Sequence, residues 1–397
     1  MERTVGTVVR GIRTPVIREG DDLVGIVADS LVECRVKEGF EFRDRDIVGV
    51  TEAVVARAQG NYASIESIRD DVAKKFGVDE FAVVFPILSR NRFAICLRGI
   101  AMAARKIHLV LSYPADEVGN YLFDEALLYD MDLNPWRDGL TLARYRELFG
   151  APVHSVTRMD YVAYYKEIVE NSGAECEITF NNNIAKIAAE YKNILLCSIH
   201  DRESQKRMFL SKGADKVLLL TDILNAKSSN GTGYNELYGL LGSNKSTEEI
   251  IKMFPRDCAA FTSDLRKKLA AVTGKQIEVM IYGDGAYKDP LYKIWELADP
   301  VVTLAYSEGL EGMTNEIKLK YLADSEYASL FGDKLTEAVR RRIGAKEGNM
   351  RESMLAQGTT PRRYVDLLGS LCDLTSGSGD KGTPVVYIQG YFDNYSD

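Results

Sequence analysis

One aspartate stands where the sequence predicts the carboxyl end of a buried strand. Residues 277–282 form an apolar run, and Gly283-Asp284-Gly285 follows it directly. Open α/β sheets bind ligands beyond the carboxyl ends of their strands, so Asp284 is a candidate metal ligand. Lys288, four residues on, is a cation for a phosphate group. The alternatives are a turn aspartate that accepts local backbone N–H groups and a solvated lysine.

A second acidic cluster follows another predicted strand. Residues 107–111 are mostly apolar, and Asp116, Glu117 and Asn120 come shortly after them. Hard divalent cations prefer oxygen ligands of this kind. The competing interpretation is a loop or helix N-terminus that Asp116 merely caps. We expect Asp116 and Asp284 to converge on one cleft, because an ion that bridges phosphates takes carboxylates from separate elements.

A glycine-rich loop precedes the last apolar run of the chain. Ser376-Gly377-Ser378-Gly379-Asp380-Lys381-Gly382 leads into residues 383–390. Successive backbone N–H groups in such a loop can surround a phosphate. The other interpretation is a flexible hairpin connection. The loop lacks the G-x-x-x-x-G-K-S/T spacing, so the sequence does not support a P-loop.

Several kinds of chemistry have no support in the sequence. The three histidines share no motif with each other or with a cysteine, and there is no G-x-S-x-G sequence, which disfavours a serine or cysteine hydrolase. The six cysteines form no C-x-x-C pair, which indicates reduced thiols rather than disulfides or a zinc site.

Composition limits the partners and the location. The net charge of −8 argues against a nucleic-acid partner, because phosphate backbones are held by clustered Lys and Arg. No apolar run approaches the roughly 18 residues that span a bilayer, and residues 1–10 lack a signal-peptide core. We therefore expect a cytoplasmic protein with small-molecule partners and no membrane contact.

The pattern along the chain predicts an α/β fold. Short strands over residues 4–10 and 14–17 precede a helix that Asp21 or Asp22 caps. Apolar runs at 46–55, 81–88 and 107–112 read as strands, and residues 155–225 alternate between helix and strand like a parallel sheet with crossovers. With 397 residues, more than one structural unit is expected.

These features occur in an order that resembles the coenzyme F-420 gamma-glutamyl ligase family. The matching segments are Thr14-Pro15-Val16 with Gly20-Asp21-Asp22-Leu23, the strand 46–52 running to Ala58-Gln59-Gly60, Asp116 with Asn120, the strand that ends at Asp284, and Gly382-Thr383-Pro384 through Gly390. The resemblance covers both ends of the chain. It implies a mixed-sheet α/β core and a homodimer that adds L-glutamate to a carboxylate with GTP and Mg²⁺ or Mn²⁺.

The resemblance also assigns residues to the site. The nucleotide-contacting positions it implies are Arg13, Thr14, Pro15 and Val16, then Glu52 and Arg57, then Asn120, then Ser376, Gly377, Ser378, Gly379, Gly382 and Thr383. The implied metal ligands are Asp116, Asp284 and Ser378, and Arg57 and Lys288 offset phosphate charge. Two positions depart from the family: Gly285 replaces a hydroxyl residue, and Ser378 replaces a glutamine.

The extra length of the chain predicts an insertion. Residues 1–130 and 270–397 are expected to form the nucleotide- and metal-binding core, and residues 131–269 an inserted βα subdomain. The predicted function is a ligase that activates a carboxylate as an acyl phosphate and joins it to L-glutamate or a similar amino acid. The alternatives are a nucleotide- and metal-binding regulatory protein without turnover, and a small-molecule domain in the central βα region.

Overall fold

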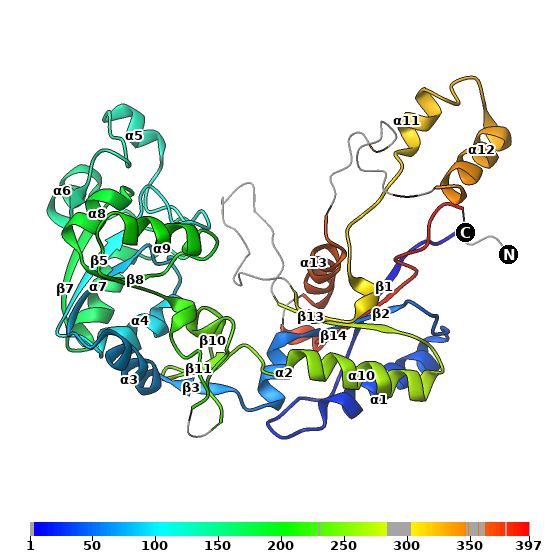
Figure 1. The fold of residues 1–397 in the computed structure, drawn as a ribbon, viewed down its shortest axis with the longest axis horizontal. Coiled ribbons are helices and arrows are strands. Elements are labelled where there is room, and N and C mark those ends of the chain that lie inside the picture. Colours follow the sequence, from blue (N-terminus) through cyan, green and yellow to red (C-terminus); the bar gives the residue numbers. More distant parts are fainter. Residues whose placement is uncertain are drawn as a thin grey trace. The chain divides into compact units, whose positions relative to one another are not determined.

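The chain folds into two compact units in the computed structural model (Figure 1). The structure describes residues 4–228, 231–283, 303–346, 348, 356, 362–377 and 379–396. Unit 1 comprises Met1–Val55, Asp257–Gly285 and Val301–Asp397, and unit 2 comprises Ala56–Arg256 and Ala286–Pro300. Within the described residues, no helix combines the length and apolar character that a bilayer span requires.

Unit 1 combines segments from both ends of the chain. Its elements are β1 (Val8–Ile12), α1 (Leu23–Glu38), β2 (Ile47–Thr51), α10 (Cys258–Thr273), β12 (Glu278–Tyr282), β13 (Thr303–Tyr306), η3 (Glu308–Leu310), α11 (Leu319–Asp324), α12 (Gly332–Gly344), α13 (Tyr364–Ser376), η5 (Gly379–Lys381) and β14 (Val385–Gln389). The helix α2 (Glu52–Ala58) follows β2 and leads into unit 2.

The described strands of unit 1 form one mixed sheet in the order β1-β14-β2-β12-β13. The pairs β1–β14, β14–β2 and β12–β13 are antiparallel, whereas β2 and β12 are parallel. Strands β2, β12 and β14 are almost wholly buried, which explains why their sequences are mostly apolar. The predicted mixed-sheet α/β class is confirmed.

Helices cover this sheet on both faces. Figure 1 shows α13 on one side and α1 and α10 on the other. The α13 side chains Leu368 and Cys372 pack on Ile47, Met280 and Ile388 of the sheet. Asp22 caps α1, and its carboxylate accepts a hydrogen bond from Gly25 N–H, as the sequence predicted. The predicted strand at 14–17 is absent there, because residue 15 is a proline without an N–H to donate.

Gly49 lets α13 approach the sheet closely, and its replacement by Ala should destabilise unit 1 by about 1–3 kcal/mol. The added Cβ would lie 2.5 Å from Cys372 Sγ, so the helix would have to shift. Urea unfolding of Gly49→Ala and of Gly49→Ala with Cys372→Ala measures this. In the Cys372→Ala background the clashing sulfur is absent. Gly49→Ala should therefore lower the free energy of unfolding less in that background than in wild type. Equal losses would contradict the clash.

Asp46, next to β2, is a buried carboxylate in unit 1. It accepts hydrogen bonds from the Tyr387 hydroxyl, from Arg43 N–H at 2.7 Å and from Gln389 Nε2 at 3.4 Å. Burial raises the pKa of Asp46, and these donors oppose the rise. The folded protein therefore binds a proton at Asp46 more readily than the unfolded chain does.

This shift sets the sign of a pH effect. Because the pKa of Asp46 is higher in the folded state, its contribution to stability is present below the ordinary value of 3.8 and is lost as pH rises through the raised pKa. Asp46→Asn removes the titration. We expect wild type to lose stability relative to Asp46→Asn as pH rises above about 4, measured by urea unfolding across the acidic range. A pH-independent difference between the two proteins would contradict the shift.

Unit 2 is built mainly from one continuous part of the chain. Its elements are β3 (Tyr62–Ser64), α3 (Ile65–Phe76), β4 (Glu80–Val84), α4 (Phe93–Ala101), β5 (Lys106–Leu111), α5 (Ala126–Asp130), β6 (Leu140–Thr141), α6 (Leu142–Phe149), α7 (Tyr161–Asn171), β7 (Glu175–Phe180), α8 (Ile184–Glu190), β8 (Asn193–Leu196), α9 (Arg202–Ser211), β9 (Lys216–Leu219), η1 (Leu220–Asp222), η2 (Gly239–Leu241), β10 (Ser243–Lys245) and β11 (Ile250–Met253).

The larger sheet of unit 2 has the described strand order β6-β7-β5-β4-β8-β9, in which only β6 runs antiparallel. Strands β10, β11 and β3 form a smaller antiparallel sheet. In Figure 1, α3 and α4 lie on one side of the larger sheet and α8 and α9 on the other. The strands alternate accordingly: Val83 packs with the α3–α4 side, and Ala82 and Val84 with the α8–α9 side.

The two ends of segment 56–256 are fastened to each other. The Gln59 side chain donates from Nε2 to Arg256 O at 2.6 Å and accepts from Arg256 N–H at 2.7 Å. Asn61, fully buried, donates to Tyr234 O and Phe254 O at 2.9 and 2.7 Å. These amides tie the outgoing and returning chain together at the point where both pass between the units.

The bounds of the compact units differ from those of the predicted division into 1–130 with 270–397 and 131–269. Strands β4 and β5 pair with β8 and β7, so residues 56–130 fold with the middle of the chain. As an assignment of function, the predicted division stays a prediction.

Candidate active site

Three segments that are distant in the sequence meet at one end of the unit 1 sheet. Ile12, the last residue of β1, pairs with Val385, the first residue of β14, and Val385 also pairs with Val50 of β2. Further hydrogen bonds join the segments at and just beyond these strand ends: Thr14 N–H donates to Gly382 O at 3.3 Å, and Thr51 N–H donates to Pro384 O at 3.0 Å.

The first segment leaves much of its surface open. Arg13, Pro15 and Val16 are exposed, and 77% of Val16 is accessible although it is a large apolar residue. The Thr14 hydroxyl donates to Pro15 O at 2.9 Å. This stretch therefore offers a cation and an apolar side chain to solvent beside the 382–384 segment.

The described residues of the glycine-rich segment, 376–377 and 379–382, lead from the end of α13 towards β14. Helix α13 ends at Ser376, and Gly377 caps it with an N–H to Asp373 O bond of 3.0 Å. The short helix η5, which begins at Gly379, leads to Gly382, and the Thr383 hydroxyl donates back to Ser376 O at 2.9 Å. Gly377 and Gly382 have φ values of 59° and 66°, a region that favours glycine. Ser378 lies outside the described residues.

Glu52 brings a buried carboxylate to this end of the sheet. It is 3% exposed and begins α2 directly after β2. Glu52 interacts electrostatically with Cys258, the first residue of α10. Burial raises the pKa of the Cys258 thiol to about 12, and the negative charge of Glu52 adds to this rise. Arg57, in the last turn of α2, is exposed and belongs to unit 2.

The register of β2 and β12 identifies what stands beside Glu52. Thr51 of β2 pairs with Tyr282 of β12 in the parallel ladder. Glu52 therefore follows the carboxyl end of β2, and Gly283 follows the carboxyl end of the neighbouring strand β12. Asp284 comes next in the sequence. Asp284, Gly285 and Lys288 lie outside the described residues, so their roles stay predictions.

Asp116 belongs to unit 2, where backbone and amide donors surround its carboxylate. Oδ1 accepts from Val118 N–H at 3.1 Å and from Asn120 N–H at 2.8 Å. Oδ2 accepts from Leu88 N–H at 2.7 Å and from Asn120 Nδ2 at 2.9 Å. Burial raises the pKa of Asp116, and these hydrogen bonds oppose the rise. Asp116 thus fastens its own loop to the loop that follows β4.

These contacts bear on the predicted metal site. A carboxylate has about four acceptor positions, and the donors around Asp116 occupy that number, so a cation would have to displace some of them. In the part of the chain that the structure describes, no three His, Cys, Asp or Glu side chains lie close enough together to hold a metal ion. A cation at Asp116 would compete with these donors, and the roles of Asp116 in metal binding and of Asn120 in nucleotide binding stay predictions.

Glu117, which the sequence placed in the acidic cluster without a role, also connects loops. Its carboxylate accepts from the N–H groups of Ile199, His200 and Asp201 at 2.6, 2.7 and 3.1 Å. These residues lie between β8 and α9, so Glu117 supplies an anion at the start of α9. The sequence carries no signal for this pairing, because the partners are more than 80 residues apart.

Comparison with known proteins places this arrangement in a family. No curated protein matches the chain. The family model described as F420-0:Gamma-glutamyl ligase matches residues 11–390, nearly the whole chain. The match extends from Gly11 in β1 to Gly390 after β14, and so includes the three segments that meet in unit 1. The chain therefore belongs to the F420-0:gamma-glutamyl ligase family, whose members are enzymes that join an amino acid to an acid.

Proposed function

We propose that this ligase uses GTP and a divalent cation, Mg²⁺ or Mn²⁺, to join L-glutamate or a similar amino acid to a small-molecule carboxylate. The observation that carries the proposal is the meeting of the Arg13–Val16, Thr51–Glu52 and 376–383 segments at one end of one sheet. Two parallel strands, β2 and β12, have their carboxyl ends there, where α/β sheets bind ligands.

The proposed reaction needs no protein nucleophile. An oxygen of the acceptor carboxylate attacks the γ-phosphorus of GTP, and GDP leaves with the electrons of the broken P–O bond. The amine of the amino acid then attacks the carbonyl carbon of the acyl phosphate; inorganic phosphate leaves, and the amine loses a proton as the amide forms. Phosphoryl transfer depends mainly on positioning and charge neutralisation. In this proposal Arg13 supplies positive charge and N–H groups of the 379–383 backbone donate to phosphate oxygens. The sequence alone suggests Arg57 and Lys288 as further cations for the phosphates.

In this proposal, Asp284 and Glu52 bind the divalent cation, and Asp116 does not. Glu52 follows β2, and Asp284 is one residue beyond Gly283, which follows β12 at the same level of the ladder. Asp116 already accepts hydrogen bonds at both oxygens. A bound cation would offset the charge of the phosphates. Ser378, in the glycine-rich segment, remains a proposed further ligand.

The remaining assignments follow from the family and from the charge. We propose a homodimer, by resemblance to the family, and small-molecule substrates without nucleic acid. The net charge of −8 supports the second point, because a nucleic-acid surface is normally basic.

Isotope transfer tests the mechanism. The protein is incubated with GTP, Mg²⁺ or Mn²⁺, L-glutamate and F420-0 whose carboxylate carries ¹⁸O. Attack by the carboxylate on phosphorus predicts one ¹⁸O in the released phosphate, together with GDP and a product that has gained one glutamyl residue. Nucleotide and metal binding without glutamate-dependent GDP release would indicate the regulatory protein instead. Product formation without ¹⁸O transfer would exclude the acyl phosphate.

A further inference from the structure

An open cavity lies in unit 1 at the end of the sheet opposite the proposed active site, where β2 begins and β14 ends. Its lining comes from residues 43–46, which lead into β2, and from Gly390, Phe392, Asp393 and Asn394, which follow β14. The cavity has a volume of about 330 Å³. Small-molecule sites typically measure about 300–1,000 Å³. The cavity therefore has room for a small organic ligand, and its whole lining belongs to unit 1.

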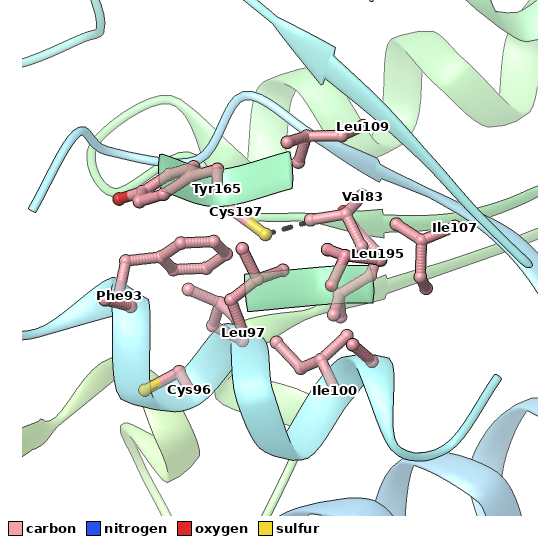
Figure 2. Close-up of a cluster of buried hydrophobic side chains, with 14 of the residues drawn as sticks. Val83, Phe93, Cys96, Leu97, Ile100, Ile107, Leu109, Tyr165, Leu195 and Cys197 are labelled. Carbon is pink, nitrogen blue, oxygen red and sulfur yellow. Dashed lines mark hydrogen bonds between the residues drawn. The ribbon is translucent and has the colours of Figure 1, made fainter. Parts of the chain in front are cut away.

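The interior of unit 2 is packed much more tightly. Between α4 and the larger sheet, Phe93, Leu97 and Ile100 pack with Val83 and Leu195 (Figure 2). The gap beside these side chains measures about 30 Å³. A gap of that size admits little more than a water molecule, so the cavity in unit 1 is the better candidate for a ligand site.

The aspartates that line the unit 1 cavity already have partners. Asp44 lies 3.9 Å from the Lys275 ammonium. Asp46 is buried and accepts a hydrogen bond from the Tyr387 hydroxyl. Asp393 likewise has an interaction of its own. The negative groups of the lining are therefore engaged within the protein.

The two arginines of the lining, in contrast, lack a charged partner. Arg43 and Arg45 form no ion pair within the residues that the structure describes. Arg45 is nevertheless held in place: its guanidinium carbon lies 4.1 Å from the centre of the Phe392 ring, and its backbone N–H donates to Gln276 O at 2.8 Å. Its φ of 64° is uncommon for a residue other than glycine. Because the ring contact orients the Arg45 guanidinium without using its N–H donors, an anion meets a partly preorganised partner.

A tight turn brings both arginines to the same cavity. Asp46 N–H donates to Arg43 O at 3.3 Å, and Arg43 N–H donates to the Asp46 carboxylate at 2.7 Å. Two guanidinium groups in one cavity suit a ligand group with two negative charges. A phosphate monoester carries about −1.5 to −2 charges at pH 7, and arginine binds phosphate oxygens through paired N–H groups. The pair Arg43 and Arg45 therefore favours a phosphate group over a carboxylate, which carries a single charge.

The rest of the lining favours a ligand that also carries hydroxyl groups. Asp44 is exposed, and its carboxylate accepts a hydrogen bond from Gln276 N–H at 2.8 Å. A carboxylate has about four acceptor positions, so Asp44 can accept further hydrogen bonds from hydroxyl groups of a ligand. The cavity thus combines cations for a phosphate with an acceptor for hydroxyl groups.

We propose that the cavity between residues 43–46 and 390–394 binds a small phosphate monoester that carries hydroxyl groups. Arg43 and Arg45 bind the phosphate, and Asp44 accepts hydrogen bonds from the hydroxyl groups. The cavity lies at the other end of the sheet from the Arg13–Val16 and 376–383 segments, so this site is separate from the proposed active site. The proposal goes beyond the ligase reaction and does not depend on it.

The test of location uses glycerol 3-phosphate as the probe and the full-length protein without nucleotide. In NMR spectra of the deuterated protein, the backbone amide signals of Arg45 and Gly390 should shift during titration and reach saturation. Those of Thr14 and Gly382, at the other end of the sheet, should not shift. Absence of shifts at Arg45 and Gly390 with millimolar probe, or shifts confined to Thr14 and Gly382, would overturn the site.

Smaller probes test the two parts of the ligand. Inorganic phosphate should bind about tenfold more weakly than glycerol 3-phosphate, because the hydrogen bonds of the hydroxyl groups are lost. Glycerol, which lacks the charge, should give no saturable shifts at millimolar concentration. Equal affinity for inorganic phosphate would contradict recognition of the hydroxyl groups, and equal affinity for glycerol would contradict recognition of the phosphate.

Substitutions test the two arginines. Arg43→Met and Arg45→Met should each weaken binding of glycerol 3-phosphate by about tenfold, because a charge-assisted hydrogen bond is lost. Arg18→Met is the matched control: Arg18 is an exposed arginine of unit 1 outside the cavity lining, and its replacement removes the same charge. Arg18→Met should bind the probe as wild type does, and thermal unfolding checks that each variant is folded. Wild-type affinity in folded Arg43→Met and Arg45→Met, or an equal loss in Arg18→Met, would overturn the proposed role of the arginines.

Discussion

Asp116→Asn should lower the stability of unit 2 by about 2–6 kcal/mol, because two buried donors would lose their acceptor at about 1–3 kcal/mol each. The amide keeps one acceptor oxygen and turns an NH₂ group toward the donors at the other position. Loss of the desolvated charge offsets part of this cost, since burial raises the pKa of Asp116. Hydrogen exchange should accelerate in peptides that contain Leu88 and Asn120, whose N–H groups it holds.

The matched control is Asp124→Asn. Asp124 is an exposed aspartate of the same connection, and it accepts from Ala126 N–H at 3.1 Å. Asp124→Asn should leave the stability of unit 2 and the rates of hydrogen exchange nearly unchanged. If Asp116→Asn instead folded like wild type and lost metal-dependent turnover, the structural role would be wrong and Asp116 would be a metal ligand after all.

Asp284→Asn and Glu52→Gln should each reduce turnover by about 100-fold or more while the protein stays folded. Both exchanges keep the shape of the side chain and remove the charge that holds a cation. The measurements are glutamate-dependent GDP release over a range of Mn²⁺ concentrations, together with thermal unfolding. A shift to a higher Mn²⁺ requirement would show that the lost carboxylate acts through the metal.

Other outcomes separate the alternatives for these two residues. An aspartate that only completes a turn is replaced by asparagine with little loss, so full activity in Asp284→Asn would remove it from the site. Glu41→Gln serves as the control, because Glu41 is exposed and pairs with Arg35 at the surface. Lost activity with a lowered melting temperature in Glu52→Gln would point to a structural role for that buried carboxylate.

Local sequence predicted the elements of this fold well. Residues 277–282 and 383–390 are mostly apolar, and they contain the predicted buried strands, β12 and β14. Asp22 was among the predicted N-caps, because a short acidic side chain before an apolar segment is a local signal. Such features depend on neighbours in the chain, which a sequence displays directly.

The pairing of distant segments was harder to predict. Periodicity identifies a strand but not its neighbour, so nothing in residues 80–84 indicates that β4 lies between β5 and β8. The role of Asp116 was ambiguous for a chemical reason: carboxylate oxygens accept backbone N–H groups and bind cations equally well in principle. The meeting of Arg13, Glu52 and Gly382 at one sheet end was anticipated only through the family resemblance.

The fastening of Gln59 to Arg256 has a consequence for how such a protein can change over evolutionary time. A segment whose two ends lie next to each other can be inserted at one position of another fold. The residues that flank the insertion then stay close together, so the surrounding fold does not have to change. The amide pair makes 56–256 a segment of that kind. Lengthening, shortening or exchange of the part of this module that lies between Gln59 and Arg256 therefore leaves the pairing of β1, β14 and β2 untouched.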